Sequence, residues 1–71
     1  MKPTDLLSVN QLNAFVTEAI LDAEHFGTRS RWLRVAEFEK ALSERAETEL
    51  ARNIARLGVE TAMEKAEACS E

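Results

Sequence analysis

The sequence is poor in the residues that usually build active sites and metal sites. It has one histidine, one cysteine, one proline, two glycines and no tyrosine among 71 residues. The single cysteine, Cys69, cannot form a disulfide within the chain. The single histidine, His25, has no plausible fixed neighbour with which to form a set of nucleophile, base and orienting residue. Two glycines are too few for a loop that cradles phosphate. We therefore expect no enzymatic activity, no cofactor and no resident metal.

Positive charge and long apolar runs are also scarce. Nine Lys and Arg residues against 13 Asp and Glu residues give a net charge of −4, which disfavours a general affinity for nucleic acid or anionic membranes. No apolar run approaches the roughly 18 residues of a membrane span, and the first residues lack the apolar stretch of a signal peptide. A lone thiol fits a reducing compartment. We expect a cytoplasmic protein without a membrane segment.

The scarcity of helix breakers predicts an all-helical chain. From Ser30 to Cys69 there is no proline and only one glycine, Gly58. The same stretch is rich in Ala, Glu, Arg and Leu, which lose little side-chain freedom in a helix. A long second helix is therefore predicted over residues 31–68, with Thr28 or Ser30 as its cap.

A shorter first helix is predicted over residues 9–26. Ser8 and Gln11 have the spacing of a capping box, in which two side chains satisfy the free amide groups of the first turn. Gly27 then supplies the left-handed residue that commonly ends a helix. The single predicted domain, 1–71, is completed by a lead-in over 1–8 and a turn over 27–30.

The unequal lengths of the two helices decide the predicted assembly. At about 1.5 Å per residue, the first helix spans roughly 27 Å and the second roughly 57 Å. The first covers the second only to about Glu47, so the apolar stripe beyond that point needs another chain. We predict an antiparallel helical hairpin, with a short helix 1 and a long helix 2, that forms a homodimer resembling a four-helix bundle. The predicted dimer interface consists of Leu50, Ile54, Leu57, Val59 and Met63.

Gly58 offers an alternative to one uninterrupted second helix. A helix could end at Gly58, with Val59 packing back onto the preceding turn and a third short helix beginning near Glu60. Glycine costs only about 1 kcal/mol inside a helix, so its presence alone does not require a break.

The only concentrated positive charge surrounds the single tryptophan at the predicted turn. Arg29, Arg31 and Arg34 bracket Trp32, and Trp and Arg are the residues that dominate protein–protein hot spots. These four residues are the predicted partner-binding site. In the alternative interpretation, Trp32 closes the end of the core against Phe26 and the arginines are merely solvated.

One further cluster invites a metal-binding hypothesis. Glu18, Asp22 and His25 are spaced by four and three residues and share one helical face. A carboxylate and a histidine at this spacing occur in di-iron bundles, which repeat the pair on several helices. This chain has one such pair, so a solvated polar face is the simpler interpretation.

The function that follows from these features is a small, non-enzymatic regulatory protein of the kind that phages and plasmids encode. It would bind a larger protein, such as a transcription regulator or an ATPase, and modulate or inhibit it. Its acidity would suit a basic surface on that partner. The alternative is a dimeric helical bundle that binds nucleic acid through Arg29, Arg31 and Arg34, which the net charge makes the weaker hypothesis.

Overall fold

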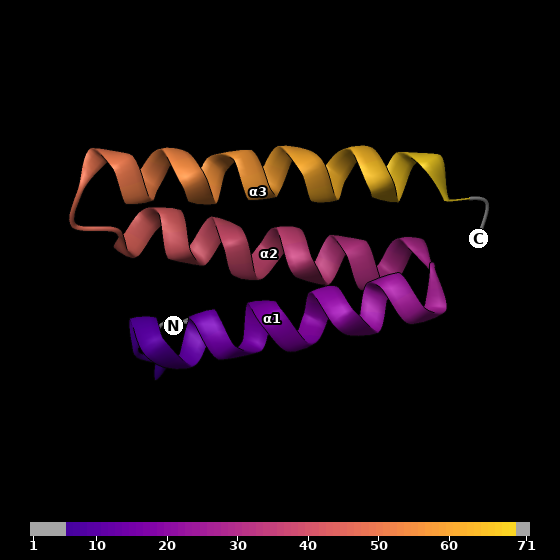
Figure 1. The fold of residues 1–71 in the computed structure, drawn as a ribbon, viewed down its shortest axis with the longest axis horizontal. Helices are drawn as coiled ribbons and strands as arrows, with labels where there is room; N and C mark the ends of the chain where they lie inside the picture. Colours follow the sequence, from indigo (N-terminus) through magenta and orange to yellow (C-terminus); the bar gives the residue numbers. More distant parts are fainter. Residues whose placement is uncertain (1–5, 70–71) are drawn as a thin grey trace.

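The computed structural model describes residues 6–69, so part of the predicted lead-in lies outside the described residues. Within this range the chain forms three helices and no strand: α1 (Val9–Phe26), α2 (Arg29–Arg45) and α3 (Glu49–Ala68). Each helix runs antiparallel to the next, and α2 lies between the other two (Figure 1). The predicted all-helical class is confirmed.

Helix α1 begins and ends at the predicted residues because its signals are local. The Ser8 hydroxyl accepts a hydrogen bond from the Gln11 amide over 3.1 Å, and Gln11 Oε1 accepts one from the Ser8 amide over 2.8 Å. Gly27 has φ +64°, a left-handed conformation that only glycine adopts at little cost. Its N–H donates to the Ala23 carbonyl over 2.7 Å. Each of these interactions is completed within about one turn.

The prediction of one uninterrupted helix over 31–68 is wrong, and so is the two-helix hairpin built on it. The chain leaves the helix at Ala46, where ψ is 135°, and resumes after Thr48. The Thr48 hydroxyl accepts a hydrogen bond from the Ala51 amide over 3.1 Å. Glu49 adds negative charge to the first turn of α3, where the helix dipole favours it. A side-chain cap of this kind contributes about 1 kcal/mol.

Folding back at this turn lets α3 pack along α2. The buried residues of α3 are Ala55, Ala62 and Ala66, and α2 meets them with small residues such as Ala36. Small side chains at the contact allow two helices to approach closely. The alternative break at Gly58 is also wrong, because Gly58 lies inside α3.

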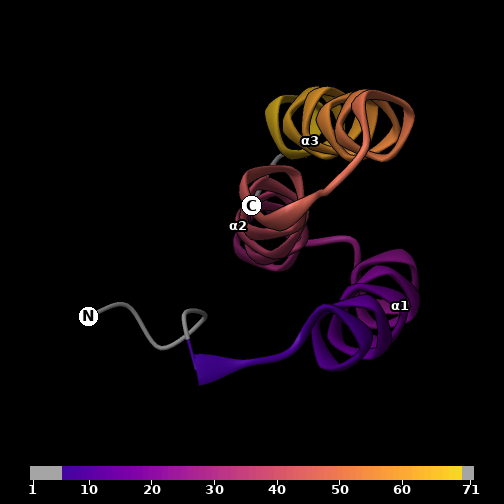
Figure 2. The same ribbon diagram turned by 90° about the vertical axis from the view of Figure 1, so that its left-hand side faces the viewer.

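The three helices form a bent row instead of a closed triangle. Helix α2 packs against both neighbours, whereas α1 and α3 barely touch each other. Viewed end-on, α1 and α3 lie toward the same side of α2 (Figure 2). The core therefore follows α2, and one side of it is left open between the outer helices. The molecule measures 35 × 22 × 21 Å.

Candidate functional site

The open side of the helical row forms a groove. Two hollows, of about 520 and 260 Å³, follow one another along α2, and Glu39 lines both of them. We call the two together the central groove. Its central acidic residue is Glu39 of α2. Its main apolar residues are Val9 and Ile20 from α1, Leu42 from α2, and Ile54 and Leu57 from α3.

The apolar walls of the groove follow from the register of α1 and α3. Consecutive residues of a helix are about 100° apart, so a residue next to a buried one lies at the edge of the buried stripe. Ile20 follows the buried Ala19, and Ile54 precedes the buried Ala55. Both helices therefore have apolar faces wider than α2 can cover, and the uncovered edges line the groove.

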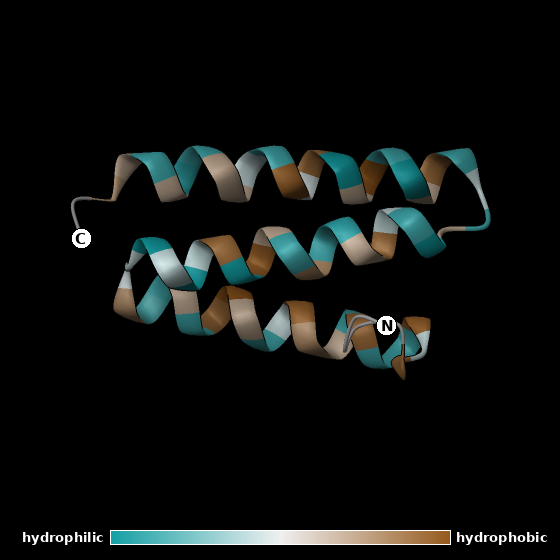
Figure 3. Cartoon of the chain, turned by 180° about the vertical axis from the view of Figure 1, so that it is seen from behind, coloured by the Kyte–Doolittle hydropathy of each residue, from teal (hydrophilic) through white to brown (hydrophobic). Residues whose placement is uncertain are grey.

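The buried core consists mainly of small apolar side chains, and many of the large ones are exposed. Among residues 6–69, seven of the eleven buried hydrophobic residues are alanine, while ten large hydrophobic residues are exposed. Leu50, Ile54 and Leu57 are 71, 60 and 61% exposed and occupy neighbouring positions on α3. Figure 3 shows hydrophobic segments recurring along this helix between hydrophilic ones. A continuous apolar stripe beside a groove is typical of a protein-binding surface.

Glu39 is the acidic residue at the middle of the groove. Its carboxylate lies against α3 at Gly58, where a β-carbon would overlap Glu39 Oε2. It forms no hydrogen bond or ion pair with any residue of the described chain. Burial raises its pKa above the ordinary value, because the charged form loses solvation that nothing replaces. The carboxylate therefore occupies its position at a cost to the free protein.

Replacing Glu39 with glutamine should stabilise the free protein by up to about 1 kcal/mol near pH 7. Folding raises the pKa of Glu39, so the protonated carboxyl group favours the folded state. This stabilisation is fully present below the pKa of the unfolded chain and is lost as pH rises through the pKa of the folded protein. The advantage of Glu39→Gln should therefore shrink as pH is lowered from about 7 to about 4. Urea denaturation monitored by circular dichroism measures the difference in the free energy of unfolding between the two proteins at each pH.

The matched control for this change is Glu37→Gln, an exposed glutamate on the same helix. We expect it to alter the free energy of unfolding by less than about 0.5 kcal/mol. The other charged residues that line the groove, Glu24, Arg45, Glu47 and Lys65, are present in both variants. A Glu39→Gln protein less stable than wild type near neutral pH would contradict the interpretation.

The residues predicted for a dimer interface are not all on one face. Ile54 and Leu57 line the central groove, and Leu50 lies one turn before Ile54 on the same side of α3. Val59 is half-buried and packs against the core cluster. Met63 is 41% exposed and lines a separate hollow on the other side of the α2–α3 pair.

Trp32, predicted as a partner anchor, is a core residue. It is 7% exposed and belongs to the cluster that joins all three helices. The Lys65 ammonium lies 4.8 Å from the centre of its ring, in the geometry of a cation–π contact. Trp32 also contributes to one end of the groove floor.

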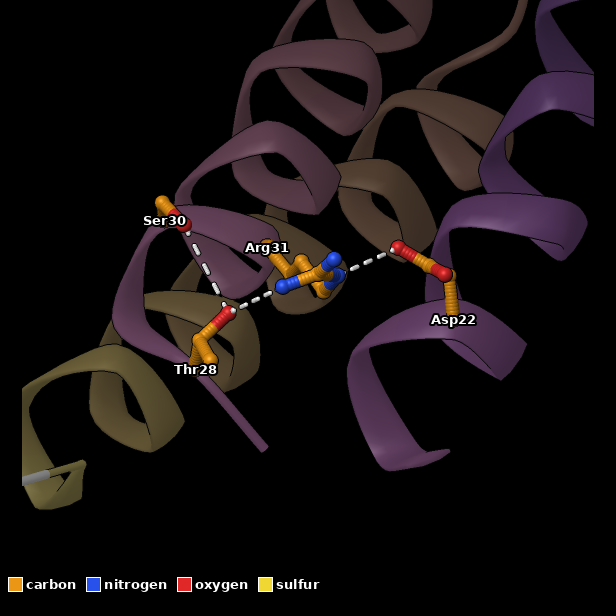
Figure 4. Close-up of polar contacts among 4 residues, drawn as sticks. All are labelled: Asp22, Thr28, Ser30 and Arg31. Atoms are coloured by element: carbon orange, nitrogen blue, oxygen red, sulfur yellow. Dashed lines mark hydrogen bonds and ion pairs between the residues drawn. The ribbon is translucent and has the colours of Figure 1, made fainter. Parts of the chain in front are cut away.

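Arg29 and Arg31 bind the chain's own helices. Arg29 donates from Nε to the Ala66 carbonyl over 3.2 Å and from Nη2 to the Cys69 carbonyl over 3.4 Å, so it caps the C-terminus of α3. Arg31 donates from Nε to Asp22 Oδ2 over 2.9 Å, which connects α2 to α1 (Figure 4). The pair is partly exposed, and such pairs contribute about 0.2–1 kcal/mol.

The remaining contacts of the Arg31 side chain fix the α1–α2 turn. Its Nη1 donates to the Thr28 hydroxyl over 3.1 Å, and that hydroxyl lies 3.5 Å from Ser30 Oγ (Figure 4). Its guanidinium carbon is 4.1 Å from the centre of the Phe26 ring. Thr28 is the N-cap residue of α2 by position. Its hydroxyl accepts a hydrogen bond from Arg31 and none from a backbone amide of the first turn.

Arg34, like Arg29, is exposed. It lines two hollows, one between α1 and α2 beside the stacked rings of Phe15 and Phe38, the other between α2 and α3. Neither hollow belongs to the central groove, because Arg34 and Glu39 are five residues apart and point to different sides of α2. The four predicted partner-binding residues are thus dispersed over the core, two helix contacts and an outer surface.

The proposed metal cluster is not assembled. Asp22 is engaged by Arg31, and His25 packs edge-on against Phe26 with ring centres 4.7 Å apart. Among residues 6–69, no group of three or more His, Cys, Asp or Glu side chains is placed to hold a metal ion. Cys69 is half-buried, and its Sγ donates to the Lys65 carbonyl over 3.2 Å.

Sequence reasoning missed Glu39 and Gly58, the pair at the centre of the groove. One signal was available: Glu39 stands four residues after Val35 and three before Leu42, on an otherwise apolar face. A charged residue at such a position indicates a site where burial is incomplete or where a partner supplies the opposite charge.

Comparison of the chain with protein-family models, with curated proteins and with solved structures found no match. None of the helices in the described residues is both long and apolar enough to cross a membrane. The candidate site is therefore interpreted from its own geometry and chemistry.

Proposed function

We propose that this protein is a non-enzymatic regulatory module that binds an amphipathic helix of a larger protein in its central groove and so modulates or inhibits that protein. One observation carries the proposal: the α3 side chains Ile54 and Leu57 are exposed and line a groove that α1 and α2 also shape. A helix laid in that groove would complete a four-helix bundle. A cytoplasmic setting belongs to the same proposal, because a single cysteine fits a reducing compartment.

A partner helix would have to cover a substantial part of this protein's surface. Each side of a standard protein interface buries about 800 Å², roughly one sixth of the 5122 Å² that this protein exposes. Covering an exposed Leu or Ile side chain completely contributes about 1.5–3 kcal/mol before the cost of association. Several such side chains are needed to offset that cost, and Val9, Ile54 and Leu57 are among the exposed ones that line the groove.

The charges in the groove favour a partner with basic residues. Glu24, Glu39 and Glu47 line it, and Arg45 and Lys65 stand toward its two ends. The net charge of −4 acts in the same direction during encounter. The nucleic-acid alternative has less support, because Arg29 and Arg31 are engaged by other parts of the chain.

A photo-crosslinker placed at two exposed positions tests the proposal. Benzoylphenylalanine at Leu57, on the groove, should crosslink in the native host to a helix of a larger protein, and a peptide of that helix should bind the purified protein. At Leu21, which is 63% exposed on α1 and lines neither hollow of the groove, it should not. Ile54→Asp should reduce peptide binding by at least about tenfold, since it puts a charge in the apolar wall.

Two outcomes would contradict the proposal. Equal crosslinking from Leu57 and Leu21 would mean that the groove is no special surface. A crosslinked product at twice the 8.0 kDa mass of the chain would identify a second copy as the occupant. That result would replace the larger partner by the homodimer that the exposed Leu50, Ile54 and Leu57 also favour.

A further inference from the structure

We propose that Glu39 makes the central groove selective for a helix with a lysine or arginine in the middle of its apolar face. This inference rests on the proposed function, because it takes the groove to be a helix-binding site. It adds the chemistry of the ligand: one cation, surrounded by apolar residues, at the level of Glu39.

Glu39 stands at the middle of the central groove. It is the residue where the two hollows of the groove meet, near the middle of α2. Apolar residues lie on either side of it along the groove, among them Leu42, Ile54 and Leu57. A helix lying along the groove would therefore meet apolar surface at most contact positions and a carboxylate at its middle.

Gly58 fixes where that carboxylate lies. Glu39 Oε2 fills the space that a β-carbon at position 58 would occupy, so the side chain rests against the α3 helix. Any other residue at 58 would push the carboxylate away from this place. Gly58 is thus a positioning residue for Glu39, which also accounts for a glycine inside a helix, where glycine is intrinsically unfavourable.

Glu39 has no internal partner among residues 6–69. The described chain offers two cations along the groove, and neither pairs with Glu39. Arg45 donates to the Leu7 carbonyl near one end, and the Lys65 ammonium sits over the Trp32 ring near the other. A cation from a bound helix would satisfy the carboxylate, whereas an apolar residue there would bury it unpaired. The groove therefore discriminates between helices by the difference in binding free energy between a paired carboxylate and one buried without a partner.

The experiment is a selection followed by matched peptides. A displayed library of amphipathic helices of about 20 residues, with its apolar face varied, is enriched on the full-length protein and depleted on Ile54→Asp. The enriched helices should carry Lys or Arg in the middle of the apolar face. The best helix is then synthesised with lysine, norleucine or glutamate at that position, and dissociation constants are measured by calorimetry.

Binding is compared in four proteins, so that the effect of the Glu39 charge is distinguished from the effect of where its carboxylate lies. Wild type and the control Glu37→Gln should bind the lysine peptide about tenfold more tightly than the norleucine peptide, the effect of one hydrogen bond to a charged group. Glu39→Gln should lose this preference. Gly58→Ala, which keeps the carboxylate but displaces it, should reduce the preference while the protein remains helical by circular dichroism.

The possible failures can be told apart. Enriched helices without a central cation, or equal binding of the lysine and norleucine peptides, would overturn the inference and leave helix binding intact. A library that yields no helix dependent on Ile54 would overturn the proposed function and the inference together. A preference for lysine that persists in Glu39→Gln would assign the selectivity to another acid and overturn the role of Glu39.

Discussion

Replacing Trp32 with alanine is expected to lower the free energy of unfolding by about 3–5 kcal/mol. Trp32 is 7% exposed and is the largest side chain in a core made mostly of alanine. It belongs to a cluster with Ala23 on α1, Val35 on α2 and Ala62 on α3, so its loss weakens the packing of all three helices. A small domain has only a few kcal/mol of stability in total, so the variant should be largely unfolded. Circular dichroism during urea denaturation measures the change.

Phe26→Ala is the matched control for Trp32→Ala. It removes an aromatic residue from the same end of the molecule, but Phe26 is 55% exposed and contacts His25 and Arg31 at the surface. We expect it to cost about 1 kcal/mol or less. If Trp32→Ala unfolded at the same urea concentration as wild type, the placement of Trp32 in the core would be incorrect and its role as a partner anchor would be restored.

Leu12→Ala is expected to release α1 from the rest of the protein at a cost of about 2–5 kcal/mol. Leu12 has 0% exposure and is the only large side chain of the described residues buried so completely. Helix α1 packs on α2 alone and barely touches α3, so no second contact holds it in place. Hydrogen exchange should show amide protection falling in α1 more than in α2 and α3.

The control for this change is Leu21→Ala, on the same helix but 63% exposed. Its effect on the free energy of unfolding should stay within about 0.5 kcal/mol. If Leu12→Ala lowered protection equally in all three helices, the protein would unfold as one unit, and α1 could not be described as a separately attached element.

The parts of the fold that sequence predicted are those with local causes. The capping box of Ser8 and Gln11 and the left-handed Gly27 specify the start and end of α1 within a few residues. Such signals do not depend on where the remaining chain goes. The helical class follows equally from composition, because few residues of this chain oppose a helix.

The turn between α2 and α3 was missed because its cause is partly tertiary. No glycine or proline occurs at Ala46–Thr48, and apolar residues continue at helical spacing across it. Thr48 was the available local signal, as a residue that caps helices well. The larger cause is the packing of Ala55 and Ala62 against α2, and helical periodicity does not reveal which helix an apolar face will meet.

The candidate site could be predicted only in part. The exposure of Leu50, Ile54 and Leu57 agrees with the sequence-based expectation that this stripe lacks cover within the chain. The groove itself and the contact between Glu39 and Gly58 depend on how three helices are arranged, which single-chain patterns do not specify. Homodimer formation stays a prediction, and the peptide and crosslinking experiments decide between a second copy and a larger partner.

The linear order of packing has a consequence for how quickly the protein reaches its structure. Because α1 packs on α2 and α2 on α3, nearly all contacts join helices that are adjacent in the chain. Bringing such helices together closes only short loops, here Gly27–Thr28 and Ala46–Thr48, so little chain entropy is lost before contacts form. Helical proteins with contacts this local refold in about microseconds to milliseconds, among the fastest of small domains.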